Sequence, residues 1–444
     1  MKARYKALVD DFSSQIRAGT LAAGHRLPTH RQLASKERIS LATATRVYAE
    51  LEEMGLVSGE AGRGTFVREI TLHPHLGVDQ LVVANDMIDL NFNYPSLPEQ
   101  ASLLRDALRK LTTTGDIESF LRYTPHGGRL QERATIARYL SGLGLNPAAE
   151  DVLIVNGAQQ GLSVALNALL KPGDVVAVDA LTYPGFRSLA EFSHLELAAV
   201  SSTPHGPDFE QLVKLCEKRR VKAIYTMPTL HNPLGWVLSH EQRTELVRIA
   251  RLYDLLIIED AAYAYLIPDA PAPLWVYAPE RTVYVNGFSK NVAAGLRVGM
   301  IVCSENTRAA LERAIRLSTW NTPSLMTAIV CGWIDDGTVS RLEKLKRQEA
   351  RDRQTLARSI FHDMPYISHP ASYFLWLPLP EDVRSEKLIR SLMDEQISVS
   401  SASPYSSGIY VPHAIRLALA SLTEERLTHA LTRVRETIHY WRDF

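Results

Sequence analysis

Residues able to bind a charged ligand follow the apolar stretches between residues 151 and 302, where each stretch ends. Short, almost continuous apolar strands that alternate with helical segments are typical of a parallel sheet covered on both faces. Ligands bind such sheets at the carboxyl ends of the strands, so we expect these residues to surround one site. They are residues 156–159 after DVLIV, Tyr183 after DVVAV, Asn232 after VKAIYTM, Asp260 and Tyr263 at the end of LLIIED, and Ser289, Lys290 and Arg297 after RTVYVN.

Pyridoxal 5′-phosphate is a ligand that would use all of these residues. Its aldehyde forms a Schiff base with an amine, which Lys290 provides. Its ring nitrogen must keep a proton, which the carboxylate of Asp260 favours. Asn232 and Tyr263 can donate hydrogen bonds to the phenolic oxygen of the ring, and Tyr183 can lie flat against its face.

The phosphate group of this ligand needs hydrogen-bond donors and positive charge, which Arg297 and Ser289 supply. The backbone amides of Ala158 and Gln159 follow a small-residue turn that opens a helix, and helix N-termini bind anions. Each residue alone has a structural alternative, since an aspartate can cap a helix, an asparagine can form a turn and a lysine can be solvated. Their joint occurrence at successive strand ends favours the cofactor.

The motifs VNGAQQGL, HNPLG, EDAAY and GFSKNVAAGLRVG stand in the order found in the fold-type I aminotransferases, which the chain resembles from residue 89 onward. The resemblance implies the roles given above, with Lys290 and Asp260 as catalytic residues. It also implies that Tyr123, in YTPHGG, reaches the phosphate of a neighbouring subunit. Arg416, in HAIRLALA, would bind the α-carboxylate of a substrate, because a guanidinium grips a carboxylate with two hydrogen bonds.

This resemblance implies an α/β fold with a mostly parallel seven-stranded sheet in a large domain, residues 89–317, and a smaller α+β domain, residues 318–444. Gly287 stands where the family commonly has a hydroxyl residue, so we expect a weaker hold on the phosphate. Ala294 stands where a proline is usual, which should only loosen the turn. In the smaller domain, the charged face of the helical segment SRLEKLKRQEARDRQTLARSIF is expected to be solvated.

The first 69 residues have the element order of a winged helix-turn-helix. Helical apolar spacing over residues 5–18 is followed by a turn, the helical segments THRQLASKERIS and LATATRVYAELEEMGLV, and the hairpin LVSGEAGRGTFV. Ser40 suits the cap of the second helix of the pair, and Thr43 and Arg46 would face the major groove from its first turn. Arg63, beside Gly64 at the hairpin tip, would reach a phosphate or the minor groove.

The segments GHRLPTHRQLA, TRVYAELEEMGLV and GRGTFV resemble the GntR family of bacterial transcription regulators. Leu41 stands where that family often has an arginine, so Arg31, Arg46 and Arg63 are expected to carry more of the DNA contact. The first 68 residues hold eleven basic and seven acidic side chains, which also favours nucleic-acid binding at this end. A winged helix kept only for protein contact is the alternative. Residues 70–88 lack periodicity and are predicted to be a linker.

A GntR-like head joined to an aminotransferase-like body is the arrangement of the MocR family of regulators, which nearly the whole chain resembles. The resemblance implies a homodimer that binds a double-stranded DNA operator. It also implies that the body senses a small amino compound, or pyridoxal phosphate itself, through a Schiff base at Lys290. Two alternatives remain open at this point: an aminotransferase with an accessory DNA-binding head, and a body that binds no cofactor.

The composition bears on several other classes of protein. The 444 residues carry 49 basic and 49 acidic side chains, and Cys216, Cys303 and Cys331 are too widely spaced for a CxxC metal site. No apolar run reaches the roughly 18 residues of a membrane span, and the first residues lack the apolar core of a signal peptide. We therefore expect a cytoplasmic protein without a metal site or membrane contact.

Overall fold

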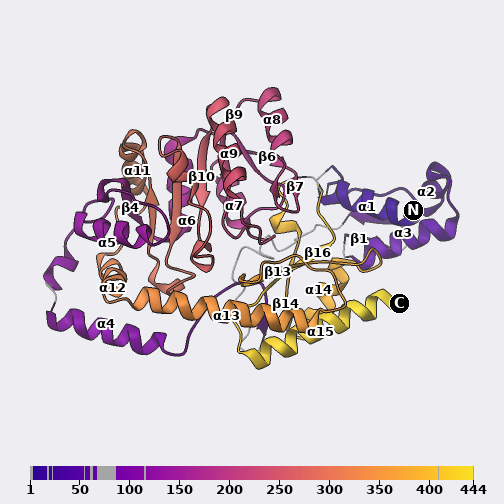
Figure 1. The fold of residues 1–444 in the computed structure, drawn as a ribbon. Helices are drawn as coiled ribbons and strands as arrows, with labels where there is room; N and C mark the ends of the chain where they lie inside the picture. Colours follow the sequence, from indigo (N-terminus) through magenta and orange to yellow (C-terminus); the bar gives the residue numbers. More distant parts are fainter. Residues whose placement is uncertain are drawn as a thin grey trace.

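The computed structural model describes residues 4–17, 20–22, 24–54, 56–60, 64–67, 87–114, 117–408 and 410–443. Figure 1 shows a large body with a small N-terminal head at one end. The wing-tip residue Arg63 and all but the last two residues of the predicted linker lie outside the described residues. Among the helices that the structure describes, none is both long and apolar enough to cross a membrane.

The head is a winged helix-turn-helix, as its element order predicts. Its hairpin is antiparallel, with Val57 opposite Val67 and Glu60 opposite Gly64. The elements are α1 (Arg4–Arg17), α2 (His30–Glu37), α3 (Leu41–Glu53), β1 (Val57–Glu60) and β2 (Gly64–Val67).

A small apolar core drawn from all three helices holds the head together. Val9 of α1, Leu33 of α2 and Leu51 of α3 are at most 1% exposed. Helix α3 begins where it is predicted to begin, because the side chain of Ser40 accepts a hydrogen bond of 3.1 Å from the backbone amide of Thr43. That cap satisfies an amide that the first turn would otherwise leave without a partner.

The body is built around the seven-stranded sheet expected from the sequence. Its strand order is β4-β12-β11-β10-β9-β5-β6, and β12 alone runs antiparallel to its neighbours. The parallel strands β10 and β11 therefore bring their carboxyl ends, at Asp260 and Gly287, to the same edge. The strands are β4 (Val152–Val155), β5 (Val175–Asp179), β6 (Glu196–Val200), β9 (Val221–Thr226), β10 (Leu256–Asp260), β11 (Thr282–Gly287) and β12 (Gly299–Val302).

Both faces of this sheet are buried, which explains why its strands read as continuous apolar runs. Along β12, Ile301 packs into one apolar cluster, while Met300 and Val302 pack into another. Helices and a short hairpin complete the large domain (Figure 1). They are α4 (Gln100–Thr114), α5 (Leu130–Ser141), α6 (Gly157–Leu169), α7 (Pro184–Phe192), β7 (Ser202–Thr203), β8 (Gly206–Pro207), α8 (Phe209–Lys218), α9 (His240–Leu252), α10 (Leu274–Tyr277), α11 (Glu305–Ser318) and α12 (Ser324–Asp335). Helix α12 belongs to this domain, because Ile329 and Val330 pack into the same apolar cluster as Met300 of the sheet, so the domain extends past the predicted boundary at residue 317.

A smaller α+β unit follows. Its three-stranded antiparallel sheet has the order β13-β16-β15, and β3 (Ile88–Asp89) pairs in parallel with β14. The segment at Ile88 therefore pairs with this unit before the chain enters the large domain. The remaining elements are α13 (Thr338–Ile360), β13 (Phe374–Pro378), α14 (Ser385–Asp394), β14 (Ile397–Ser398), β15 (Ser400–Ser401), β16 (Ala414–Ala418) and α15 (Glu424–Asp443).

Helix α13 corrects part of one expectation. Lys344, Arg351, Asp352 and other charged side chains are exposed as expected. Glu343 and Lys346, however, are buried, Lys346 completely. A sequence pattern of charges cannot distinguish water from main-chain carbonyls as the partner of a cation, and Lys346 has the latter. Helix α13 therefore has a buried polar face that contacts the large domain.

The core of the head yields the first testable prediction. Leu51→Ala removes a fully buried side chain from α3 and should destabilise the head by about 2–5 kcal/mol. Amide hydrogen exchange across residues 24–54 should then accelerate in the full-length protein. Leu41→Ala is the matched control on the same helix, because Leu41 is 49% exposed and its truncation should leave exchange unchanged. Equal exchange in the two variants would contradict this description of the core.

Candidate functional site

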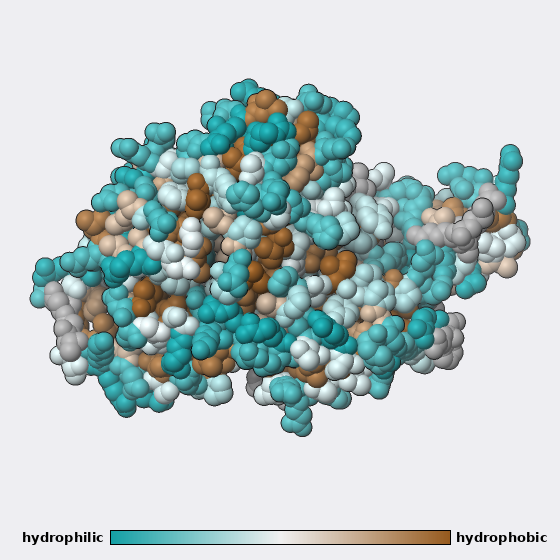
Figure 2. All heavy atoms as spheres, in the orientation of Figure 1, coloured by the Kyte–Doolittle hydropathy of each residue, from teal (hydrophilic) through white to brown (hydrophobic). Residues whose placement is uncertain are grey.

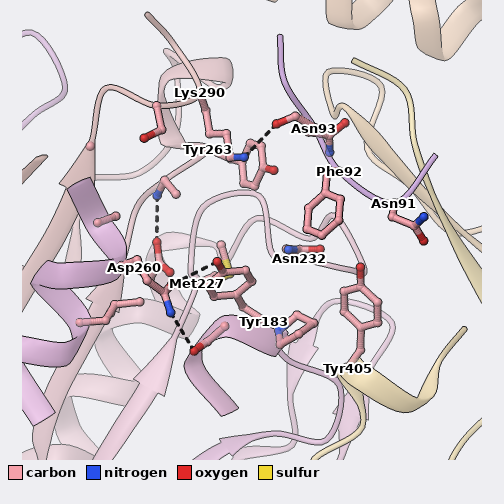
Figure 3. A pocket seen from close by; sticks show the side chains of 18 of the residues that line it. Asn91, Phe92, Asn93, Tyr183, Met227, Asn232, Asp260, Tyr263, Lys290 and Tyr405 are labelled. Atoms are coloured by element: carbon pink, nitrogen blue, oxygen red, sulfur yellow. Dashed lines mark hydrogen bonds between the residues drawn. The ribbon is translucent and has the colours of Figure 1, made fainter. Parts of the chain in front are cut away.

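A cavity of about 430 Å³ lies at the carboxyl ends of the parallel strands, between the large sheet and the small domain. Figure 3 shows Lys290 and Asp260 on one side of it, with Phe92 and Tyr405 on the other. The structure brings nearly all of the predicted body residues to this cavity: Ala158, Gln159, Tyr183, Asn232, Asp260, Tyr263, Ser289, Lys290, Arg297 and Arg416.

Asp260 is a buried acid at the end of β10. Its carboxylate accepts hydrogen bonds from the hydroxyl of Tyr225, at 2.8 Å, and from the backbone amide of Ala262, at 3.0 Å. Burial raises the pKa of Asp260, although both hydrogen bonds lower it. Within the described ranges no cationic side chain pairs with this carboxylate, so the group suits a cationic ligand.

Tyr225 positions Asp260 through its hydrogen bond, and the sequence interpretation did not identify it. It lies in the middle of the sheet on β9, and its ring stacks on Phe186 with centroids 3.6 Å apart. In sequence it looks like one more apolar strand residue, since its contact with Asp260 joins two different strands. Only its hydroxyl distinguishes Tyr225 from the apolar residues around it, and hydroxyl side chains are too common in strands to identify a site.

Lys290 follows β11 and extends into the cavity. Its Nζ donates a hydrogen bond of 2.8 Å to the backbone carbonyl of Asn93 (Figure 3). Its own carbonyl accepts a hydrogen bond of 3.0 Å from the hydroxyl of Tyr265. Residues 91–95, which we call the strap, thus pass directly over the amine. Every residue has a backbone carbonyl, so the sequence could not show that the carbonyl of Asn93 accepts this hydrogen bond.

An anion cradle lies at the N-terminus of α6. The guanidinium of Arg297 donates hydrogen bonds of 3.1 Å to the hydroxyl of Ser289 and to the carbonyl of Asn156. Asn156, the cap residue, makes no side-chain hydrogen bond to the first turn of α6. The backbone amides of that turn therefore remain available to an anion.

Two glycines keep the cradle open. A Cβ atom on Gly157, whose φ is +79°, would lie 2.6 Å from Nη2 of Arg297. A Cβ atom on Gly287 would lie 3.1 Å from the backbone nitrogen of Ala158. The weaker phosphate hold expected from Gly287 remains a prediction, but the close approach gives a physical reason for glycine at this position.

Three polar side chains surround the centre of the cavity. Asn232 is buried, and its Oδ1 has no hydrogen-bond partner among the described residues. Tyr263 is also buried, with its ring edge-on to Phe374 at 5.3 Å between centroids. The hydroxyl of Tyr183 donates a hydrogen bond of 3.2 Å to Gln159. A buried amide oxygen without a partner is costly, so the site is suited to a polar ligand at this point.

Arg416 is 3% exposed and lies on β16 at the small-domain side of the cavity. Its Nη1 donates a hydrogen bond of 2.7 Å to the carbonyl of Asn91. Its Nε is buried and has no partner within the described part of the chain. The guanidinium also lies 5.0 Å from the ring centre of Phe374. A buried cation with an unused donor suits a carboxylate.

These features fit pyridoxal phosphate on the donor chemistry alone. The cavity combines an amine, a buried acid that lacks a cation, and an anion cradle. The described residues hold no group of three or more His, Cys, Asp or Glu side chains that could bind a metal. Further lining residues that the sequence interpretation did not identify are Asn91, Phe92, Asn93, Met227 and Tyr405.

Tyr123 is the one predicted body residue that does not line the cavity. It is 86% exposed, and its ring lies 5.6 Å from that of Trp320, which is 47% exposed. Leu121, two residues earlier, is also exposed. The reach of Tyr123 to a neighbouring subunit therefore stays a prediction, and its exposure leaves it accessible to one.

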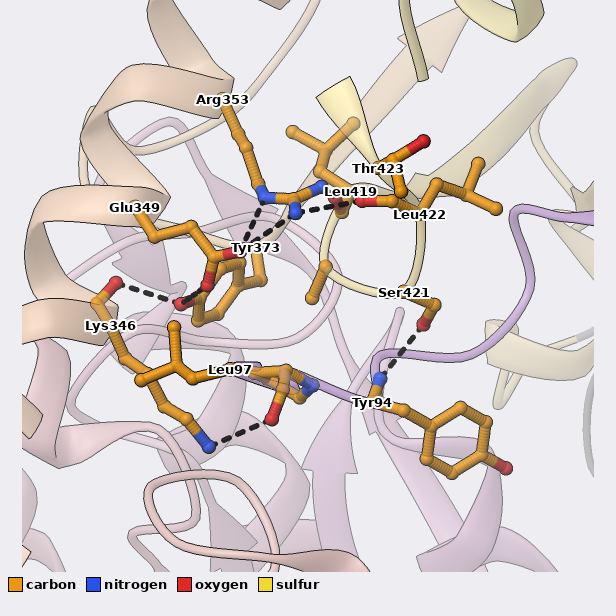
Figure 4. Close-up of polar contacts among 12 residues, drawn as sticks. Tyr94, Leu97, Lys346, Glu349, Arg353, Tyr373, Leu419, Ser421, Leu422 and Thr423 are labelled. Carbon is orange, nitrogen blue, oxygen red and sulfur yellow. Dashed lines mark hydrogen bonds and ion pairs between the residues drawn. The ribbon is translucent and has the colours of Figure 1, made fainter. Parts of the chain in front are cut away.

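Helix α13 carries a network of polar contacts that includes Lys346, Glu349 and Tyr373 (Figure 4). Nζ of Lys346 donates hydrogen bonds of 2.7 Å to the carbonyl of Pro95 and 2.8 Å to that of Val292. Burial lowers the pKa of Lys346 to about 8. One turn further, Glu349 accepts a hydrogen bond of 2.8 Å from the hydroxyl of Tyr373. Helix α13 thus ties the strap and the Lys290 loop together.

The predicted DNA-binding side chains of α2 and α3 are exposed or partly exposed on the head. Ser40 and Arg31 are exposed, and Thr43 is partly exposed beside the cap of α3. Arg46 is exposed, with its guanidinium 4.2 Å from the ring centre of Tyr5 on α1. The charged end of Arg46 thus lies against α1, and it would have to leave Tyr5 to reach a base.

The geometry of the wing explains why β2 begins with a glycine. Gly64 has a φ of +122°, and a Cβ atom there would lie 2.8 Å from Nε of Arg26. Arg26 also forms a β-bridge with Phe66. The exposed Arg26 is therefore a cation at the wing that the sequence interpretation did not select, because its proximity to the hairpin arises only on folding.

Comparison with known proteins gives two family matches. Residues 4–67 match the bacterial regulatory proteins of the gntR family, and residues 85–434 match aminotransferase class I and II. The chain is 25% identical over 437 residues to the uncharacterized HTH-type transcriptional regulator YdeF of Bacillus subtilis, covering 98% of this chain and 94% of the relative. It is 26% identical over 350 residues to 2-aminoadipate transaminase of Thermus thermophilus, covering 77% and 86%.

Solved structures share the fold of the body. A kynurenine aminotransferase of Pyrococcus horikoshii aligns with a TM-score of 0.75 and 23% identity, over 80% of this chain and 92% of that chain. The archaeal alanine:glyoxylate aminotransferase aligns with a TM-score of 0.74 at 24% identity, over 80% and 91%.

The raised pKa of Asp260 predicts a pH dependence. Below that pKa the acid is neutral and no longer attracts a cationic ring, so pyridoxal phosphate affinity should fall as the pH drops through it. Tyr225→Phe removes a hydrogen bond that lowers the pKa and should move the midpoint of this fall to higher pH. Asp260→Asn should abolish the dependence and weaken binding by at least about tenfold, the equivalent of one pKa unit.

Absorbance titrations with pyridoxal phosphate at a series of pH values measure these midpoints. Asp269→Asn is the control, because Asp269 is an exposed acid of the same domain that does not line the cavity. It should keep the wild-type midpoint. A Tyr225→Phe midpoint equal to that of the wild type would contradict the role of Tyr225.

The cradle predicts a second result. Gly157→Ala would place a methyl group against Arg297 and should weaken pyridoxal phosphate binding by about tenfold or more, the value of one charge-assisted hydrogen bond. Gly173→Ala is the control, since Gly173 has a similar φ of +86° and nothing within 4 Å of an added Cβ. Both variants carry a backbone cost of roughly 1–2 kcal/mol, but only the first should lose affinity. Equal affinity losses would refute the cradle.

Proposed function

Because the chain belongs to the aminotransferase class I and II family and has a gntR-family domain at its N-terminus, we propose that it is a DNA-binding transcription regulator that binds pyridoxal phosphate. The observation that supports this most is the pairing of a winged head with a cavity equipped for the cofactor. The relatives named as HTH-type regulators match almost the full length of the chain, head included.

Different residues of the cavity would bind different groups of the cofactor. Lys290 presents its amine, and Asp260 keeps a negative charge close to the ring nitrogen. Asn232 and Tyr263 hold the phenolic oxygen, and Tyr183 packs against the ring. The phosphate would lie in the cradle formed by Ser289, Arg297 and the amides of Ala158 and Gln159. The bound cofactor supplies an aldehyde that exchanges reversibly between amines, which is the chemistry that a sensor of amino compounds needs.

The ligand to be sensed is a small amino compound or pyridoxal phosphate itself. Arg416 supports a compound with a carboxylate, since its Nε remains unused beside the cavity. The exposed Tyr123 and Trp320 support a homodimer that contacts this side of the body. Residues 1–69 would contact an operator, while the large and the small domain would close around the ligand. Binding to chromosomal DNA would place this protein in the cytoplasm.

An aminotransferase with an accessory head is the second candidate. It is favoured by the presence of Lys290, Asp260 and Arg416 together around one cavity. Steady-state turnover of an amino donor with a keto acid separates the two functions. A regulator should turn over partially or not at all, whereas an aminotransferase should sustain full turnover.

Direct binding measurements test the regulator. The purified protein, loaded with pyridoxal phosphate, should prefer the DNA upstream of its own gene to a scrambled fragment at physiological salt. One or more of the twenty L-amino acids should change that affinity by about fivefold or more, within the usual range of coupling between sites. Fluorescence anisotropy measures the affinity, and absorbance spectra report the occupancy of the cavity.

Lys290 is tested separately. Borohydride reduction followed by mass spectrometry should place the cofactor on Lys290, and Lys290→Ala should lose both the adduct and the response to amino acids. The absence of any DNA preference in the wild type would overturn the regulator, and an unmodified Lys290 would overturn the sensor.

A further inference from the structure

Five charged side chains meet where the head contacts the small domain. Arg384, at the start of α14, donates hydrogen bonds of 2.6 Å to Asp10 of α1 and 2.8 Å to Glu50 of α3. Lys6 of α1 forms an ion pair with Asp382. We call these five residues the docking cluster. It joins two parts of the chain that are more than 330 residues apart in sequence.

The central arginine of this cluster is unusually well enclosed. Arg384 is 4% exposed, although most arginines of folded proteins keep their charge in water. Burial lowers the pKa of Arg384, but the hydrogen bonds to Glu50 and Asp10 outweigh burial and the net direction is upward. The guanidinium therefore stays charged, and its planar fork holds one helix of the head with each of two nitrogens.

The cluster engages the end of α3 that is remote from the predicted DNA contacts. Glu50 lies in the last turn of α3, whereas Ser40 and Thr43 lie at its start. Figure 2 shows the head projecting from one end of the body. Docking through Glu50 thus fixes the direction of α3 without covering its first turn. The contact orients the head rather than blocking it.

The cluster is also close to the cavity along the chain. His413, whose Nε2 lies 4.0 Å from Asp10, immediately precedes β16. Its carbonyl accepts a hydrogen bond of 2.9 Å from the amide of Leu379, in the segment that leads to Arg384. Arg416, which lines the cavity, is the third residue of β16. Ladder pairing of Trp376 with Arg416 and Pro378 with Ala414 makes this path rigid.

We propose that the docking cluster, centred on Arg384, fixes the orientation of the DNA-binding head on the small domain and couples it to the occupation of Arg416 through β16. The inference rests on the proposed function and names the contact through which the two ends communicate. By linkage, a ligand that changes docking must itself bind differently to the docked and undocked forms.

Two independent variants break the cluster from opposite sides. Arg384→Met keeps the apolar stem and removes the cation, while the double variant Asp10→Asn with Glu50→Gln removes both acids. Arg390→Ala is the matched control, since Arg390 is an exposed arginine on the same helix, α14. Far-ultraviolet circular dichroism and the spectrum of bound pyridoxal phosphate verify that each protein is folded.

A zero-length carbodiimide cross-link between Lys6 and Asp382, identified by mass spectrometry, reports the docked head. We expect the cross-link in the wild type and in Arg390→Ala. Both cluster variants should give at least about tenfold less cross-link, because the loss of one charge-assisted hydrogen bond lowers the equilibrium constant for docking by about tenfold. Equal cross-linking in all four proteins would overturn the docking role.

Coupling is measured as the ratio of DNA affinities with and without the L-amino acid that changes the wild-type spectrum most. We expect this ratio to fall from about fivefold or more towards one in both cluster variants, while the amino acid still changes the spectrum. An unchanged ratio in these variants would overturn the inference. A wild type that shows no DNA preference or no spectral response would instead overturn the proposed function, so the two failures are distinguishable.

Discussion

A carboxylate buried without a cation is the constraint around which the body is arranged. Asp260 lies at the end of β10, and its two hydrogen bonds, from Tyr225 and Ala262, only partly offset the cost of removing its charge from water. Among the described residues nothing positive neutralises it. A cationic ring in the cavity would restore the balance, which gives this strand end a reason to be polar in an otherwise apolar sheet.

The lysine opposite this acid is held by both domains at once. Its amine contacts the strap at Asn93, and its carbonyl contacts Tyr265 and, at 3.3 Å, Lys346 of α13. Helix α13 continues into the small domain, where Arg353 binds the carbonyl of Leu422 (Figure 4). The small domain therefore cannot shift without changing the contacts that position Lys290. Closure of the cavity is therefore expected to change the position of this amine.

The sequence predicted those parts of the site that depend on local order. Strand ends follow from apolar runs, so Asp260 and Lys290 could be placed at one edge before the sheet was known. Tyr225, Lys346 and Arg384 could not, because each acts through a contact with an element distant in sequence. The prediction of a solvated charged face on α13 failed at Lys346 for the same reason, because a buried lysine that donates to carbonyls looks the same in sequence as a solvated lysine.

Two buried cations lie where parts of the chain meet: Lys346 between α13 and the large domain, and Arg384 between the small domain and the head. Their hydrogen-bond partners differ in kind. Lys346 donates to neutral main-chain carbonyls, so opening its joint would leave carbonyl groups of a buried loop without partners. Arg384 pairs with Asp10 and Glu50, whose charges all regain water when the head undocks. The desolvation cost recovered on undocking offsets much of the attraction lost. The head joint is therefore the softer of the two, and the body should keep its cavity formed while the head changes position.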